Sequence, residues 1–156
     1  MTVRASSALD FIDDFLQGHN AKDGAYFRSI CILLSYSFEL LLKSVVVFTS
    51  EYNSKDELEK ELRNLNHDLI KIAVQLGEDK LQRIGIIGVD RRSTPAFIGY
   101  IVNTTSGKQI TVENFIDIRY DFTNDSLRDL PEDEEFRLWV EQTQMIYSKI
   151  KELHLS

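Results

Sequence analysis

The chain has 156 residues, and its 25 acidic against 18 basic side chains leave a formal net charge of -7. This length is sufficient for one domain with a hydrophobic core, and we predict a single domain over residues 1–156. The 43% apolar content is that of a globular chain. Affinity for a nucleic-acid backbone depends on lysine and arginine, so the acidic balance argues against a broadly basic binding surface. It stays compatible with a small cationic site.

The chain lacks the residue patterns that common cofactors require. Cys31 is the one cysteine, so neither an internal disulfide nor a cysteine zinc cluster can form, and no zinc or nucleophile motif is present. The longest apolar run, Ile30–Phe48, is interrupted by Ser35, Glu39 and Lys43. We therefore predict no metal, no other cofactor, no membrane span and a cytoplasmic location.

The first half of the chain has the periodicity of helices. A first helix is expected between a cap at Ser6 or Ser7 and a stop at Gly18. A second helix is predicted over residues 25–48. Because this second helix is apolar on nearly every side, it belongs at the centre of a bundle.

The third segment carries a continuous apolar stripe. Its leucines and isoleucine recur at alternating spacings of four and three, at Leu58, Leu62, Leu65, Leu69, Ile72 and Leu76. Gly77 is a candidate C-terminal cap. Asn64 and Asn66 argue for a break within the stripe, and Asn66 can cap a new helix that starts at His67.

Residues 78–110 look like an insertion. Glycines and a proline interrupt the pattern here, and the region around 84–112 is expected to be either an irregular loop or a short β-hairpin. In the hairpin alternative, the segments AFIGYIV and QITV pair across the turn-rich NTTSGK. Two further helices are predicted, over 112–120 and 134–153. The predicted fold is an all-α, up-and-down bundle of four to five helices.

Two short polar segments are the candidates for chemistry. RNLNHDL spans Arg63–Leu69 and contains His67, whose side chain can titrate near neutral pH. DRRST contains the adjacent Arg91 and Arg92, which can contact phosphate or an acidic partner. The simpler interpretations are a helix start at His67 and Asp68, and a solvated arginine pair.

Three segments together resemble the HEPN domain, a small helical domain linked to nucleotide and RNA biology. They are YSFELLLKSVV, which holds Glu39 and Lys43, NHDLIKIAVQLG, which holds His67, and IRYDF, which holds Arg119. They fill the family's Glu-x-x-x-Lys element, its histidine-acid-leucine helix start and its arginine-tyrosine corner. The resemblance covers residues 25–153 and implies a helical bundle, frequently a homodimer.

The resemblance also bears on catalysis. Active HEPN ribonucleases carry an arginine, a polar residue and then a histidine, with four to six residues between the arginine and the histidine, and two subunits form a metal-free site. Arg63 and His67 have only three residues between them, and Asp121 stands where the family often has proline. If these two residues share one helix, however, their i, i+4 spacing would place them on one face.

The sequence therefore favours a catalytically degenerate HEPN-like binding or interaction module, which the resemblance places in a defence or toxin–antitoxin setting. The alternatives are a metal-independent HEPN ribonuclease and a structural partner protein without a nucleic-acid role. Expected partners are a second copy of the chain, RNA or a nucleotide, or another protein. The candidate catalytic residues are His67, Arg63 and Arg119, and the candidate binding residues are Tyr120, Asp68, Arg91 and Arg92.

Overall fold

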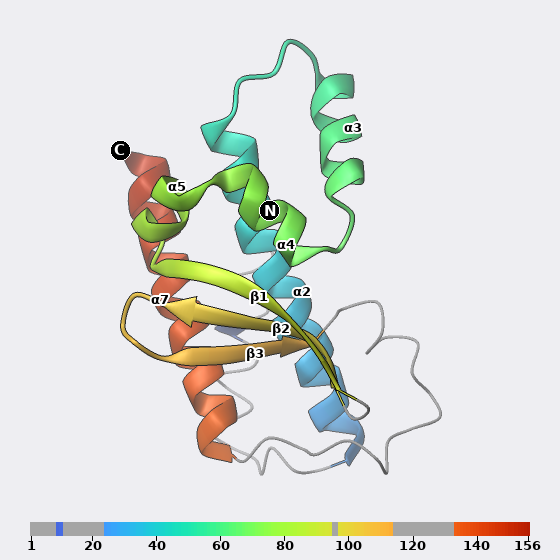
Figure 1. The fold of residues 1–156 in the computed structure, drawn as a ribbon, viewed down its shortest axis with the longest axis vertical. Coiled ribbons are helices and arrows are strands. Elements are labelled where there is room, and N and C mark those ends of the chain that lie inside the picture. Colours follow the sequence, from blue (N-terminus) through green and yellow to red (C-terminus); the bar gives the residue numbers. More distant parts are fainter. Residues whose placement is uncertain (1–8, 11–23, 95–96, 114–132) are drawn as a thin grey trace.

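A computed structural model describes residues 9–10, 24–94, 97–113 and 133–156 (Figure 1). The first predicted helix lies outside these residues except for two helical positions, and the helix predicted over 112–120 lies almost wholly outside them. Five helices and three strands are present in the described part. In chain order they are α2 (Gly24–Thr49), α3 (Lys55–Leu65), α4 (Leu69–Leu76), α5 (Glu78–Arg83), β1 (Ile86–Thr94), β2 (Phe97–Thr104), β3 (Gln109–Glu113) and α7 (Asp133–Leu155).

The centre of the molecule is α2. Its side chains from Leu34 to Val46 are buried apart from the half-buried Tyr36, and Phe38 is fully enclosed. The helix packs against α4, α7 and β3. A helix that is apolar on most sides has no solvent face to present, so neighbours surround it, as the sequence predicts.

The same helix is long and apolar enough to cross a membrane by length and composition. The window Ile32–Thr49 has a mean hydropathy of 1.7, and 67% of it is buried inside the protein. Core helices of soluble proteins and signal sequences share these properties, so the window is weak evidence for a span.

The predicted third segment is two helices rather than one. α3 begins at a Ser54 cap, whose hydroxyl accepts from the Glu57 amide, and it ends before Asn66, which has a φ of 52°. The cap of α4 is Asp68, not Asn66, because the Asp68 carboxylate accepts from the first backbone amides of α4. Gly77 then ends α4 with a φ of 80°, a conformation that favours glycine.

The segment after α5 forms a three-stranded antiparallel sheet in the order β1-β2-β3. Residues on its inner face are buried against the helices, among them Ile86, Tyr100, Val102, Ile110 and Val112. The outer face is polar, where the Asn103 amide bonds to Asp90 at 3.0 Å and the Gln109 amide bonds to Asn103 at 2.8 Å. This alternation is that of a sheet with one solvated face.

The prediction of an all-α bundle is therefore wrong. β2 and β3 form the hairpin that is one of the two alternatives for the region around 84–112, and β1 adds a third strand that the sequence pattern does not indicate. The inner face of this sheet covers α2 and α7 and completes the core (Figure 1). The fold is a mixed α/β architecture in which residues 86–113 are part of the core rather than an insertion on its surface.

The up-and-down arrangement is also wrong for the two longest helices. Phe48 near the C-terminal end of α2 lies against His154 near the C-terminal end of α7, with 4.9 Å between their ring centroids. α2 and α7 therefore run in the same direction (Figure 1). Parallel neighbours need a long connection, and α3 to α5 and the sheet lie between α2 and α7 in the chain.

Candidate functional site

A buried ion pair lies on the central helix. Glu39 and Lys43 are 2% and 8% exposed, and the Lys43 ammonium donates to Glu39 Oε1 at 2.7 Å. The same ammonium also donates to the backbone carbonyl of Asn66. A buried charge needs such partners because its removal from water is costly. The pair therefore joins α2 to the α3–α4 junction.

His67 completes this contact from the junction. Its Nδ1 lies 2.9 Å from Oε2 and 3.0 Å from Oε1 of Glu39, and its side chain is 33% exposed. An ionised carboxylate only accepts hydrogen bonds, so the form of His67 that fits this contact carries a proton on Nδ1. Glu39 thus sets both the tautomer and the orientation of the imidazole.

Asp68 links the same junction to the sheet. Its Oδ1 accepts from the amides of Ile70 and Lys71 at 3.0 and 3.4 Å. Its Oδ2 accepts from Arg91 Nη2 at 2.9 Å. One carboxylate therefore caps α4 and holds an arginine of β1.

Tyr100 is a member of this cluster that the sequence pattern does not single out. It stands opposite Arg91 in the β1–β2 register and is buried. Its hydroxyl donates to the carbonyl of His67 at 3.5 Å, and the Arg91 guanidinium lies 6.0 Å from the centre of its ring. Tyr100 therefore contacts the backbone of His67 through its hydroxyl and the Arg91 guanidinium through its ring.

The two adjacent arginines of β1 point to opposite faces of the sheet. Arg91 pairs with Tyr100, whose side chain is on the inner face, whereas Arg92 pairs with Gly99. Because neighbouring residues of a strand alternate between faces, Arg92 lies on the outer face. Of the predicted arginine pair, only Arg91 belongs to the cluster.

Arg63 does not join His67. Its guanidinium bonds to Glu59 at 3.2 Å within α3, and its side chain is 78% exposed. The expectation that the two residues share a helix face is wrong, because α3 ends at Leu65 and Asn66 turns the chain. Arg119 and Tyr120 lie outside the described residues.

The cluster consists of Glu39, Lys43, His67, Asp68, Arg91 and Tyr100. Two carboxylates balance two cations, and the oriented imidazole adds a group that can accept or donate a proton. The Arg91 guanidinium is 61% exposed and can offer N–H donors to an anionic ligand, and His67 precedes the Asp68 that holds it. Within the described ranges, no three histidine, cysteine or acidic residues are placed to hold a metal ion.

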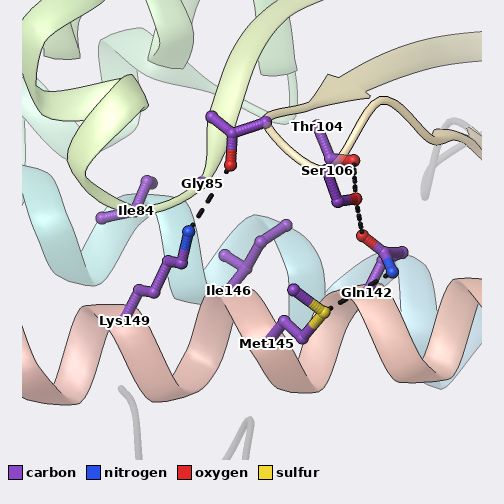
Figure 2. Close-up of a pocket in the computed structure, with 9 residues that line it drawn as sticks. Ile84, Gly85, Thr104, Ser106, Gln142, Met145, Ile146 and Lys149 are labelled. Atoms are coloured by element: carbon purple, nitrogen blue, oxygen red, sulfur yellow. Dashed lines mark hydrogen bonds between the residues drawn. The ribbon is translucent and has the colours of Figure 1, made fainter.

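A second polar feature lies where the β2–β3 turn meets α7. Figure 2 shows a chain of hydrogen bonds that runs from Thr104 through Ser106 and Gln142 to the sulfur of Met145. Lys149 lies over Gly85 and bonds to Thr105. The hollow between these residues has room for little more than a water molecule. We therefore interpret this feature as a packing contact between the sheet and α7 and not as a ligand site.

Comparison with known proteins identifies no relative of this chain. No family model matches the sequence, and no curated protein or solved structure is significantly similar to the chain. The HEPN resemblance accordingly rests on the three sequence segments alone, of which IRYDF lies outside the described residues.

Proposed function

We propose that this chain is an HEPN-like binding module that takes the phosphate group of a nucleotide or an RNA at His67 and Arg91 and does not cleave it. The observation that supports this most is the convergence of residues far apart in sequence. Glu39 orients His67, and the α4 cap brings Arg91 of β1 to the same cluster. Imidazolium and guanidinium N–H groups are a usual donor set for phosphate.

The acidic net charge fits this proposal better than it fits an extended nucleic-acid surface. A phosphate backbone bound over many nucleotides requires several cations in a row. The proposed site needs one arginine and one histidine. The resemblance further suggests that the module is a homodimer in a defence or toxin–antitoxin setting, and light scattering after size-exclusion chromatography tests the dimer.

The arginine pair provides a matched test of the binding site. We expect Arg91→Ala to weaken binding of adenosine monophosphate about 10- to 100-fold, since a hydrogen bond to a charged group contributes about 1.5–3 kcal/mol. Arg92→Ala removes the same charge from the opposite face and should leave binding unchanged. Titration calorimetry with the nucleotide measures both effects, and adenosine without phosphate serves as the ligand control.

A similar loss in the two arginine variants would point to general electrostatic attraction and contradict the proposed site. Equal binding of adenosine and its monophosphate would show that phosphate is not the group recognised. A short RNA labelled at one end, tested by fluorescence anisotropy, separates an RNA ligand from a free nucleotide.

The Glu39–His67 contact also favours a second candidate, a metal-independent ribonuclease. A carboxylate that orients a histidine is a common support for a general base. Under the binding-module proposal, we expect no cleavage when the wild-type protein is incubated with mixed RNA in EDTA. Cleavage that disappears in His67→Ala and in Arg91→Ala but persists in Arg63→Ala would instead establish the nuclease, with Arg91 as the charge-stabilising residue.

A further inference from the structure

The contact between Arg91 and Asp68 has the properties of a replaceable ion pair. It consists of one hydrogen bond, from Nη2 to Oδ2, and the Arg91 side chain is 61% exposed. Guanidinium groups bind carboxylate and phosphate most strongly through two parallel hydrogen bonds. A single exposed bond contributes little, so an incoming anion can compete with it.

Asp68 does not depend on Arg91 to satisfy its charge. Its other oxygen accepts the backbone amides of Ile70 and Lys71 at the start of α4, where the helix dipole favours a negative group. The carboxylate can therefore release the arginine and remain hydrogen-bonded. The guanidinium in turn keeps its contact with the face of the Tyr100 ring.

We propose that Asp68 is an internal competitor, which occupies Arg91 in place of the ligand's anionic group and is displaced when that group binds. The inference rests on the proposed function, because it concerns the regulation of the same site. It assigns the ligand to phosphate-bearing molecules that reach Arg91 from solvent. The Asp68–Arg91 contact then lowers the apparent affinity of the site for its ligand, since every ligand must first displace the carboxylate.

Asp68→Asn tests this role without removing the cap of α4. Asparagine caps helices about as well as aspartate, while its neutral amide cannot form an ion pair with Arg91. We expect the variant to bind adenosine monophosphate about two- to fivefold more tightly than the wild type, the gain from one exposed ion pair. Titration calorimetry measures binding, and urea unfolding checks that the variant stays folded.

Two double variants test whether the gain in affinity depends on Arg91. Arg92→Ala with Asp68→Asn should bind like Asp68→Asn alone, whereas Arg91→Ala with Asp68→Asn should lose the gain. Binding by a folded Asp68→Asn variant that equals or falls below that of the wild type overturns the inference and leaves the proposed function standing. Absence of binding in both the wild type and the variant overturns both, and binding by the variant alone supports the competitor most strongly.

Discussion

Replacing Glu39 with alanine is expected to lower the free energy of unfolding by about 3–5 kcal/mol, the cost of removing one member of a buried ion pair. Lys43 would keep its bond to the Asn66 carbonyl but lose the carboxylate that balances its charge. His67 would lose its acceptor at the same time. Urea unfolding followed by circular dichroism measures the loss.

The control for this prediction removes both charges together. Glu39→Leu combined with Lys43→Met fills the space with apolar side chains, and such exchanges are often close to neutral. We expect the double variant to be more stable than Glu39→Ala. A loss below about 1 kcal/mol in Glu39→Ala would contradict the burial of the pair, since exposed pairs contribute that little.

Replacing Tyr100 with alanine is expected to cost about 3–5 kcal/mol, as for other buried aromatic side chains. The ring is enclosed between the sheet and the α3–α4 junction. Tyr100→Phe is the matched control, because it keeps the ring and removes only the hydroxyl, which donates to the His67 carbonyl. We expect this control to lose less than about 1 kcal/mol. Urea unfolding compares both variants with the wild type.

This pair of variants also distinguishes the observed fold from an all-α bundle. In a helical bundle with residues 78–110 as a surface insertion, Tyr100→Ala would be nearly harmless. A large loss requires the sheet to be part of the core, as the structure places it. Nearly equal stabilities of the alanine and phenylalanine variants would therefore argue against the packed sheet.

The long helices can be predicted from sequence because their burial pattern has the period of a helix. α2 and α7 extend over Gly24–Thr49 and Asp133–Leu155, within two residues of the predicted 25–48 and 134–153. Two asparagines signal the break after Leu65. Which residue caps α4 is not determined by the sequence, since Asn66 and Asp68 are both good caps.

There is a physical reason why β1 is not predicted from the sequence pattern. This strand has one solvated face, a shift in register between Ile86 and Gly88, and charged residues at its centre, so Asp90, Arg91 and Arg92 look like a loop. Its alternation becomes visible only when β2 is placed beside it. The pairing of Arg91 with Tyr100 cannot be predicted from the sequence either, because strand register depends on long-range contacts.

For the candidate site, the sequence indicates the residue types but not how they combine. His67, Asp68 and Arg91 are separate candidates in the sequence, and Glu39 and Lys43 are exceptions on an apolar helix. Arg63 is a reasonable partner for His67 only if both share one helix. The positive φ of Asn66 removes that geometry and turns His67 toward Glu39.

The sequence by itself determined that α2 and α7 are long helices and which polar residues interrupt the apolar pattern of α2. These are local properties, fixed by side-chain period and composition. The tertiary structure decided that residues 86–113 form a sheet in the core and that Arg91, rather than Arg63, joins His67. Both depend on contacts between residues distant along the chain, whose pairing follows from the burial of one sheet face against α2 and α7 and not from any single segment.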